Sequence, residues 1–322
     1  ADDPMKLKSN IVDNVIAVWY EEAANFKGPD VFDQANPTFI RQKPDYVDHV
    51  TVYYSYNPPK NPYDWINEWI SKQEQNPDCY VDTSTYLDDK WGFTTKQQLD
   101  LINQYKDNDY DYYRWLYLGE VIGLGTNIFN MANFHAIKEL PDDDEIVAVY
   151  YSADTGHEVS ATTCTAYALT RKRNVIALDT YYYSPQGKSH KKPPSELSRD
   201  LKRFIDKVTD QIGKQPQRLT IDSAEGALDN QFYNDFGIHW HKVNKLKKVD
   251  MIDRVQDLAA QGRLFYLDND DNQIWVEQCR KYQWDENTLE SDDPKVIKVD
   301  DHCCDNLQYF VHDNERELGL KW

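Results

Sequence analysis

The stretch Ile146-Val-Ala-Val-Tyr-Tyr-Ser-Ala-Asp154 is a mostly apolar run that ends in a carboxylate, and the fold prediction depends on it. Such a run is typical of a buried strand with a polar residue at its carboxyl end. Two more strands are predicted at 161–170 and 174–183. A helix at 195–212 and a strand from Arg218 to Asp222 follow them.

Beyond Asp222 the apolar spacing alternates between helical and strand periods. The predicted elements are helices at 226–235, 250–261 and 273–283, strands at 238–243 and 263–267, and a last helix that begins near Asp301. Three consecutive strands followed by alternating helices and strands favour an α/β fold, with a mixed sheet and helices on both of its faces.

Asp154 and Asp222 each end a predicted strand, and Asp305 lies in the last predicted helix. If the two strands are parallel neighbours, their carboxyl ends place both side chains in one crevice. Three carboxylates would then form a hard oxygen site for Mg²⁺ or Mn²⁺. Two such ions roughly 3.5 to 4 Å apart would suit phosphodiester hydrolysis. A strand-end aspartate is more often a turn or helix-capping residue, and that alternative stays open for each of them.

His302 lies one helical turn before Asp305, on the same face of the predicted helix. It could bind metal, orient a water or contact a phosphate, with a capping or surface role as the alternative. Asp301 is better placed to be the N-cap of that helix than a ligand. His157 and Glu225 are close in sequence to the carboxylates, and we expect them at most to support the site.

The composition limits the classes to which the chain can belong. Its 322 residues suit two domains, and its 40% hydrophobic and 28% charged content are those of a soluble globular protein. No membrane span or secretion signal is expected. The five cysteines are odd in number and lack CxxC spacing, which indicates free thiols and argues against zinc. With a net charge of -19, any contact with DNA must be local.

The first part of the chain carries two apolar runs that predict buried parallel strands. Val15–Tyr20 is followed by Glu21 and Glu22, and Val50–Tyr54 is followed by Ser55-Tyr-Asn-Pro-Pro59. Helical patterns follow at about 61–75 and 94–117. We expect one domain at 1–125, a connector at 126–140 and a second domain at 141–322.

At this point the chain resembles the large terminase subunit of tailed bacteriophages, a family of DNA-packaging motors that join a P-loop ATPase domain to an RNase H-like nuclease domain. The similarity runs through nearly the whole chain. Its motifs are Glu21-Glu22, Tyr54-Ser-Tyr-Asn-Pro-Pro59, Thr85-Tyr-Leu-Asp-Asp89, Tyr113-Arg-Trp-Leu-Tyr-Leu-Gly-Glu120, Ser152-Ala-Asp-Thr-Gly156, Ile221-Asp-Ser-Ala-Glu225 and Asp301-His-Cys-Cys-Asp305. The last of these motifs is the most specific.

For the nuclease domain, the resemblance implies that Asp154, Asp222 and Asp305 bind two Mg²⁺ or Mn²⁺ ions and that His302 belongs to the catalytic site. The implied activity is an endonuclease that cuts concatemeric double-stranded DNA. The implied partners are phage DNA, the portal protein and the small terminase subunit, with no membrane. The implied location is the host bacterial cytoplasm, transiently at the portal of the procapsid.

For the ATPase domain, the resemblance makes Glu21 and Glu22 the Walker B pair and places Ser55 and Asn57 in the coupling motif. A P-loop needs GxxxxGK[ST] before Walker B, and this sequence contains none. Gly187-Lys-Ser189 is a false match, because position 182 is tyrosine where glycine is required. We therefore expect this polypeptide to lack the front of its ATPase domain and neither to bind ATP tightly nor to hydrolyse it. ATP would be a cofactor only of a full-length protein.

Since the net charge is acidic, DNA binding would have to depend on three basic clusters, each of which could also be a solvated turn. They comprise Arg171, Lys172, Arg173, Lys188, Lys191, Lys192, Lys245, Lys247 and Lys248. Contacts with phosphates would position a duplex without reading its sequence.

Two other functions remain to be weighed. The second domain could be another RNase H-like enzyme, such as a resolvase, transposase or ribonuclease, although the Walker B and Asn-Pro-Pro pattern counts against that. The chain could also be a non-catalytic assembly module that docks on the portal or the small subunit.

Overall fold

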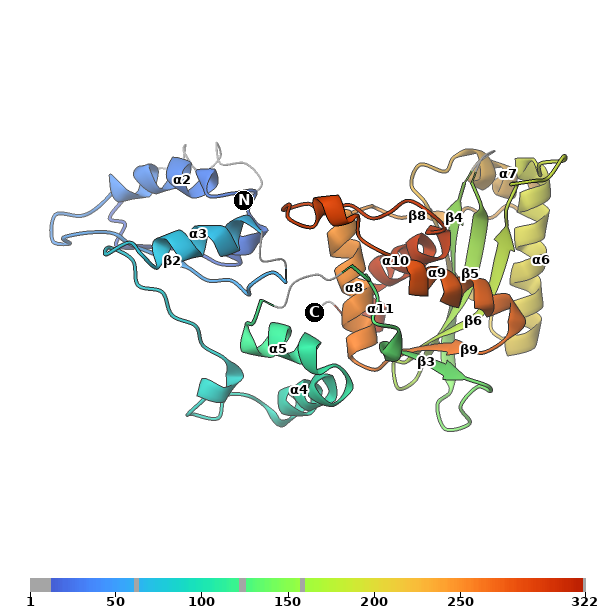
Figure 1. Ribbon diagram of the computed structural model, residues 1–322, viewed down its shortest axis with the longest axis horizontal. Coiled ribbons are helices and arrows are strands. Elements are labelled where there is room, and N and C mark those ends of the chain that lie inside the picture. The colour runs from blue at the N-terminus through green and yellow to red at the C-terminus, as the bar shows by residue number, and fades with distance from the viewer. Residues whose placement is uncertain (1–12, 61–63, 122–125, 157–159, 321–322) are drawn as a thin grey trace. The chain divides into compact units, whose positions relative to one another are not determined.

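The computed structural model describes residues 13–60, 64–121, 126–156 and 160–320 (Figure 1). The chain divides into two compact units. The first consists of Ala1–Lys106, Tyr110–Leu124 and Glu290–Asp292, and the second of Asp107–Asp109, Gly125–Leu289 and Asp293–Trp322.

The first unit contains a parallel pair of strands, β1 (Ala17–Tyr20) and β2 (Thr51–Tyr54). Its helices are α2 (Asp30–Ile40), α3 (Trp65–Gln73), α4 (Lys96–Asn108) and α5 (Tyr110–Leu118). Tyr20, Phe32 and Ile66 centre a small core between β1, α2 and α3. The helix α2 is not predicted from the sequence, because Pro37 interrupts its helical pattern.

The parallel pairing of the first two strands is as predicted, but their burial is not. Ile16, Trp19 and Tyr53 are 56%, 65% and 56% exposed. Within the described residues this sheet has only two strands, so it has too little neighbouring structure to bury both faces. The apolar runs in the sequence therefore predict the two strands correctly, but the prediction that both strands are buried is wrong.

The second unit is built on seven described strands: β3 (Phe134–Ile137), β4 (Ile146–Thr155), β5 (Thr162–Thr170), β6 (Val175–Tyr183), β7 (Pro216–Ile221), β8 (His241–Lys242) and β9 (Leu264–Leu267). They form one mixed sheet in the order β3-β9-β6-β5-β4-β7-β8. Strand β5 is antiparallel to β4 and β6, and the other neighbouring pairs are parallel. The predicted α/β class with a mixed sheet is confirmed.

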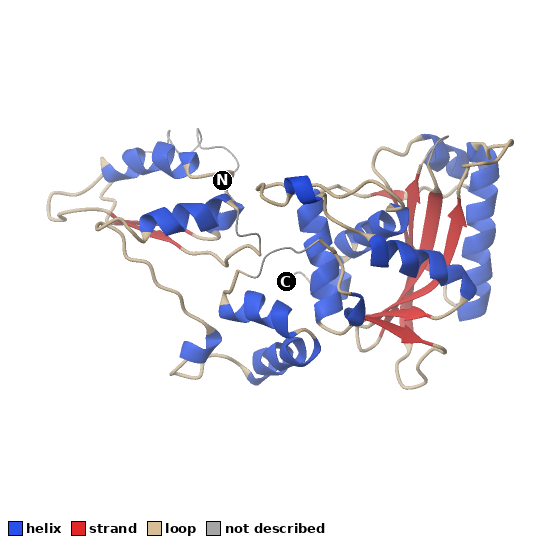
Figure 2. Ribbon diagram, in the orientation of Figure 1, coloured by secondary structure: helices blue, strands red, loops and turns tan. Residues whose placement is uncertain are grey.

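Six described helices accompany the sheet: α6 (Pro194–Ile212), α7 (Ala227–Phe236), α8 (Lys248–Ala260), α9 (Gln273–Lys281), α10 (His302–Asp313) and α11 (Glu315–Leu318). Figures 1 and 2 show α6 on one face of the sheet and α8, α9 and α10 on the other. Leu197, Leu201, Ile205 and Val208 form the apolar stripe by which α6 packs on the sheet.

Two boundaries differ from the sequence prediction. The expected connector at 126–140 contains β3, which pairs with β9, so the sheet begins before residue 141. The strand predicted at 238–243 shortens to the two residues of β8. Trp240 draws the preceding chain away from the sheet, because its ring packs on Phe232 and its backbone N–H donates to the carboxylate of Asp229.

The strand β4 shares its alternate residues between the two helical layers. Val149, Tyr151 and Ala153 belong to the core under α6. The intervening residues meet α10 one helical turn at a time: the Tyr150 ring lies 5.6 Å from that of Phe310, and the Ser152 hydroxyl donates to the Asn306 carbonyl at 2.7 Å. Every second residue of β4 thus contacts a residue one turn further along α10. These contacts fix where α10 begins relative to the end of β4.

Asn306 is the centre of a buried polar network between α10 and β5. Its side-chain oxygen accepts from the Tyr167 hydroxyl at 2.7 Å. Its amide nitrogen donates to the hydroxyls of Thr163 and Thr165 at 2.9 and 3.2 Å. The Tyr167 ring also stacks on Phe310, with centroids 4.3 Å apart. Every member is buried, so the network holds α10 in one register on the sheet.

The five cysteines are all free, as predicted. Cys164, Cys279, Cys303 and Cys304 are buried, whereas Cys79 in the first unit is exposed. Burial raises the pKa of the Cys164, Cys303 and Cys304 thiols above the ordinary value. Of the helices described, none is both long enough and apolar enough to cross a membrane.

Replacing Asn306 by leucine is expected to lower the free energy of unfolding by about 2–4 kcal/mol, because three buried hydroxyls lose a partner. Gln308→Met on the same helix is the matched control, since one atom of the buried Gln308 amide has no partner among the described residues. Urea denaturation of both variants measures the difference. Equal losses would show that the Asn306 network does not anchor α10.

Asp144 provides a pH-dependent contribution to stability. Burial would raise the pKa of this carboxyl, but hydrogen bonds from Thr170, Lys172 and Asn174 outweigh burial and lower the pKa below its ordinary value. The stabilisation is therefore fully present above about pH 4 and is lost as the pH falls through the lowered pKa. Asp144→Asn should cost about 1–3 kcal/mol at pH 7. Denaturation series at several pH values should show this difference shrinking below pH 4, and a constant difference would contradict the assignment.

Candidate active site

Asp154 and Asp222 lie side by side at one end of the sheet. The strands β4 and β7 are parallel neighbours, with Ala153 paired to Ile221, so the residue after each member of this pair is one of the two aspartates. The two strands are thus the parallel neighbours that the predicted crevice required. Asp154 is the second-last residue of β4, and Asp222 follows β7 directly and accepts the N–H of Ala224 at 2.9 Å.

The start of α10 brings His302 and Asp305 to the same end of the sheet. The His302 Nδ1 lies 2.6 Å from an oxygen of Asp154. This contact continues the series in which alternate residues of β4 meet successive turns of α10. Asp301 is at the N-cap position of the helix, as predicted, but its side chain makes no capping hydrogen bond and pairs instead with Lys298 at 3.1 Å.

The carboxylates influence one another electrostatically. Burial, and the charges of Asp305 and Asp222, raise the pKa of Asp154, while its hydrogen bond with His302 acts in the opposite direction. Burial would lower the pKa of His302, but the Asp154 carboxylate outweighs burial and raises it. The three aspartates therefore form one cluster, in which a proton or another cation relieves the repulsion.

Lysines supply cations to the two remaining carboxylates. The Lys245 ammonium lies 2.6 Å from Asp222, and the Lys248 ammonium lies 2.6 Å from Asp305. Burial would raise the pKa of Asp222, but the hydrogen bonds from Lys245, from the Ala224 N–H and from Tyr309 lower it below its ordinary value. Lys298 lies 3.5 Å from the second oxygen of Asp305.

The donor set fits a hard divalent cation, since it consists of clustered carboxylates that already hold ammonium groups. In their present orientations, however, no three His, Cys, Asp or Glu side chains of the described chain are arranged to hold an ion. The physical reason is that the carboxylates point to His302, Lys245 and Lys248. Binding of an ion would therefore require Asp222 and Asp305 to give up their lysine partners.

Two groups that face the cluster were not predicted from the sequence. The Tyr309 hydroxyl donates to Asp222 at 3.3 Å, and Tyr309 stands one helical turn after Asp305, a spacing that could have identified it. No sequence signal marks Lys298, which reaches Asp305 from a loop. Glu225 is buried, accepting from the Thr155 hydroxyl at 2.7 Å and from the backbone N–H of Leu228, so it caps α7. His157 lies outside the described residues.

One of the three basic clusters lies at the end of the sheet opposite the carboxylates. Ile146 pairs with Thr170 and Asp154 with Thr163, so the turn at Arg171–Arg173 follows the end of β5 that is opposite the carboxylates. Eight residues of β4 separate the two ends by about 26 Å. Within that turn, Arg171 and Lys172 pair with Glu145 and Asp143. This cluster therefore does not lie beside the aspartates.

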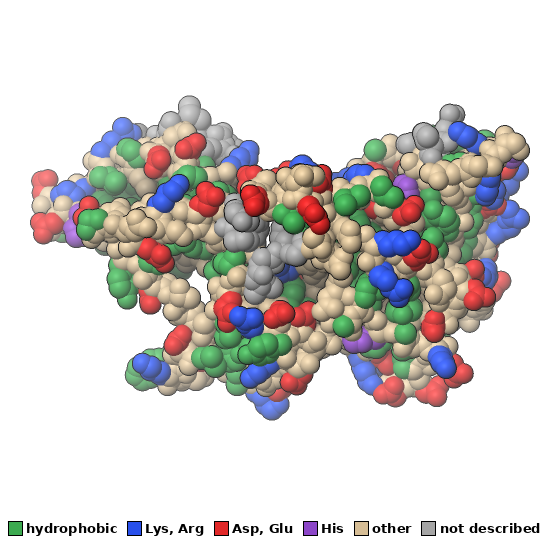
Figure 3. Space-filling view, viewed as in Figure 1, with side chains coloured by type: hydrophobic (Ala, Val, Ile, Leu, Met, Phe, Trp, Pro, Cys, Tyr) green, Lys and Arg blue, Asp and Glu red, His purple; other side chains and the backbone are tan. Residues whose placement is uncertain are grey.

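The other two clusters follow strands that end near the carboxylates. The loop after β6 holds Lys188 and Lys192 over the ring of Tyr183, at 4.3 and 4.8 Å, and Lys192 also pairs with Asp200. Lys191 of this loop is exposed. The segment after β8 holds Lys245, Lys247 and Lys248. On the face shown in Figure 3, acidic and basic side chains are interspersed.

In the first unit, the predicted Walker B and coupling residues are adjacent. The Ser55 N–H donates to the carbonyl of Tyr20 at 3.0 Å, and the N–H of Ala23 donates to the carbonyl of Ser55 at 2.9 Å. Glu21 and Glu22, between these two bonds, are exposed. Glu22 adopts a left-handed conformation with φ of 52°. Asn57 is exposed in the segment after β2.

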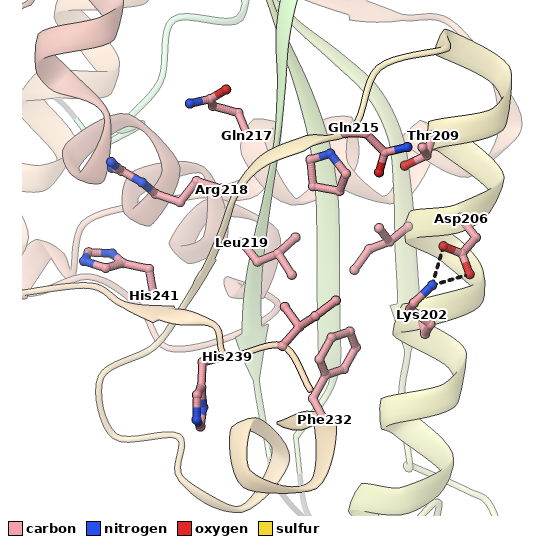
Figure 4. Close-up of a pocket in the computed structure, with 13 residues that line it drawn as sticks. Lys202, Asp206, Thr209, Gln215, Gln217, Arg218, Leu219, Phe232, His239 and His241 are labelled. Carbon is pink, nitrogen blue, oxygen red and sulfur yellow. Dashed lines mark hydrogen bonds and ion pairs between the residues drawn. The ribbon is translucent and has the colours of Figure 1, made fainter. Parts of the chain in front are cut away.

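A pocket of about 490 Å³ lies elsewhere in the second unit, between α6, α7 and the beginning of β7 (Figure 4). Ile205, Leu219 and Phe232 line its apolar part, and Lys202 pairs with Asp206 at its rim. None of the predicted site residues lines it. The pocket is therefore separate from the carboxylate cluster.

Comparison with known proteins gives matches along most of the chain. Residues 1–120 match the family model of the phage terminase large subunit, and residues 154–313 match that of the terminase RNase H-like domain. The large terminase subunit of Bacillus phage SPP1 is 31% identical over 127 residues, which are 39% of this chain and 30% of that protein. The chain thus spans less than a third of the length of this relative.

Two solved structures have the same fold as this chain. The large terminase of a thermophilic bacteriophage superposes with a TM-score of 0.71 at 20% identity, covering 96% of this chain and 70% of that one. The same phage protein in complex with ADP also gives 0.71 at 20% identity, covering 96% and 71%. The second unit thus has the RNase H-like fold of these proteins, and the chain belongs to the family of phage terminase large subunits.

Proposed function

We propose that the second unit is a metal-dependent endonuclease that cuts double-stranded phage DNA during packaging, with Asp154, Asp222 and Asp305 as its metal ligands. The observation that carries the proposal is the convergence of three carboxylates from β4, β7 and α10 at one end of the sheet. Repulsion among clustered carboxylates destabilises the folded protein unless cations neutralise them. Such unfavourable arrangements of charge are typical of catalytic sites. The match to the terminase RNase H-like family supports the proposal.

When bound, two Mg²⁺ or Mn²⁺ ions would activate a water and stabilise the leaving oxygen of the scissile phosphodiester. The chain's own residues prepare the site for this chemistry. Asp154 orients His302 through Nδ1, which leaves the other ring nitrogen to exchange a proton with water or with the leaving oxygen. Tyr309 orients the Asp222 carboxylate by donating to it.

The substrate proposed is duplex DNA, held through its phosphates by the basic segments near the carboxylates. Lys188, Lys191, Lys245 and Lys247 of those segments are exposed. Phosphate contacts of this kind position DNA without reading sequence. The cluster at Arg171–Arg173 is left out of this interface, because it stands at the other end of β4 and two of its cations, Arg171 and Lys172, are paired with carboxylates.

For the whole protein, we propose a packaging ATPase that works with the portal protein and the small terminase subunit in the host bacterial cytoplasm, transiently at the procapsid. Glu21 and Glu22 would serve as its Walker B pair, and Ser55 and Asn57 would couple hydrolysis to movement. The ladder between Tyr20, Ala23 and Ser55 supports such coupling, since it joins the two motifs directly. The structure of the thermophilic phage's large terminase with ADP is in keeping with a nucleotide site in the complete protein.

Cleavage of plasmid DNA in Mn²⁺ or Mg²⁺ tests the nuclease. Loss of a residue that hydrogen-bonds to a metal ligand typically lowers activity about 10- to 100-fold. Asp222→Asn replaces a proposed ligand itself, so it should reduce the cleavage rate by more than that. Asp210→Asn, which changes an exposed carboxylate on α6, is the matched control and should cleave normally. Metal-independent cleavage, or an Asp222→Asn variant as active as wild type, would contradict the proposal. No cleavage by wild type would favour a docking module.

The DNA interface is tested by the salt dependence of duplex binding. The affinity should fall steeply with salt, and Lys247→Ala should reduce the slope of log affinity against log salt by about one, because one phosphate contact is lost. Arg171→Ala should leave the slope unchanged, since that residue lies far from the carboxylates and pairs with Glu145. Fluorescence anisotropy with one duplex at several salt concentrations measures both. Binding that does not depend on salt would contradict the interface.

A further inference from the structure

Three ammonium groups from two separate segments converge on two of the proposed metal ligands. Lys245 lies in the segment between β8 and α8, Lys248 is the first residue of α8, and Lys298 is in the loop before α10. Asp222 holds Lys245 at 2.6 Å, while Asp305 holds Lys248 at 2.6 Å and Lys298 at 3.5 Å through different oxygens. Both oxygens of Asp305 thus contact a cation.

These contacts use the atoms that a divalent ion would need. A carboxylate oxygen binds Mg²⁺ or Ca²⁺ at about 2.0–2.6 Å. An ammonium at hydrogen-bond distance from the same oxygen therefore competes with the metal ion for it. Two cations that share one carboxylate also repel each other at short range. Binding of a divalent ion and retention of the lysines must therefore oppose each other.

The position of Lys248 in α8 is unfavourable unless it has an anionic partner. Lys247 and Lys248 are the N-cap and first residue of this helix, where the helix dipole disfavours a cation. Asp305 compensates in the arrangement described, and a DNA phosphate would do so equally well at a helix N-terminus. Lys245 and Lys248 have side chains that are 37% and 22% exposed, so they can turn to solvent on their flexible stems.

We propose that Lys245, Lys248 and Lys298 are internal counter-ions that compete with divalent metal for Asp222 and Asp305, and that metal binding releases Lys245 and Lys248 to hold the DNA phosphates. This inference rests on the proposed nuclease function. It makes the lysines and the metal alternative occupants of one set of oxygens. Metal and DNA then strengthen each other's binding. Metal frees the lysines to bind phosphates, and phosphates hold the lysines away from the carboxylates that bind metal.

The affinity for Mn²⁺ without DNA tests the competition, measured by isothermal titration calorimetry on the full chain. Lys248→Met and Lys298→Met keep an apolar stem but remove the ammonium, so each should bind Mn²⁺ about three- to tenfold more tightly than wild type. Lys298 has a side chain that is 63% exposed, so its replacement leaves the fold intact even if that of Lys248 does not. Circular dichroism checks both variants.

Lys242→Met is the matched control, since it removes one positive charge from β8, next to the same segment, where the lysine pairs with Asp229 and not with Asp222 or Asp305. It should change the Mn²⁺ affinity by less than about twofold, as expected for an exposed and screened charge. Unchanged or weaker Mn²⁺ binding by both test variants, in a wild type that binds Mn²⁺ and cleaves DNA, would overturn the inference alone. Failure of wild type to bind Mn²⁺ would overturn the nuclease proposal as well.

The release of the lysines to DNA has its own readout. Duplex affinity is compared with and without Ca²⁺, for wild type and for the double variant Lys245→Met, Lys248→Met. Ca²⁺ should strengthen DNA binding by wild type at least about threefold more than by the double variant, because only wild type has lysines to release. An equal gain in both proteins would show that the coupling does not pass through these lysines.

Discussion

The second unit depends on the way in which α10 lies across β4 and β5. A strand presents every second residue to one face and a helix presents every third or fourth, so the two can match only at a few points. Here they match three times, at Phe310, Asn306 and His302, opposite Tyr150, Ser152 and Asp154. The buried bonds of Asn306 fix the register, because each of its side-chain polar atoms already has a partner. A shift of α10 by one residue would break all of these contacts and move Asp305 away from the aspartates of the sheet.

The site combines two opposite electrostatic demands. The cluster gathers three carboxylates in a chain whose net charge is already -19, so it adds local repulsion to a global excess of negative charge. His302 and the lysines of two segments offset the local part. The same lysines place positive charge beside the carboxylates at this end of the sheet. A polyanion can therefore approach here even though the protein as a whole repels it.

The sequence was sufficient to predict the class of the second unit and the neighbourhood of Asp154 and Asp222, because strand-end carboxylates on parallel neighbours follow from local patterns. It was not sufficient for β3, α2 or the short β8. Trp240 leaves the sheet because of a contact with Phe232, and Pro37 continues a helix in spite of its local preference. Both effects arise from tertiary packing. The contacts of Lys248 and Lys298 with Asp305 join segments whose proximity depends on the final fold, so no spacing in the sequence marks them.

The burial of four of the five cysteines has a practical consequence. Cys164, Cys303 and Cys304 are shielded from water and their thiols resist ionisation, whereas Cys79 is exposed in the other unit. A maleimide dye added under native conditions therefore attaches to Cys79 and spares the thiols beside the carboxylates. A second dye on an introduced surface cysteine of the RNase H-like unit would then report, by energy transfer, how far apart the two units stand as the protein handles DNA.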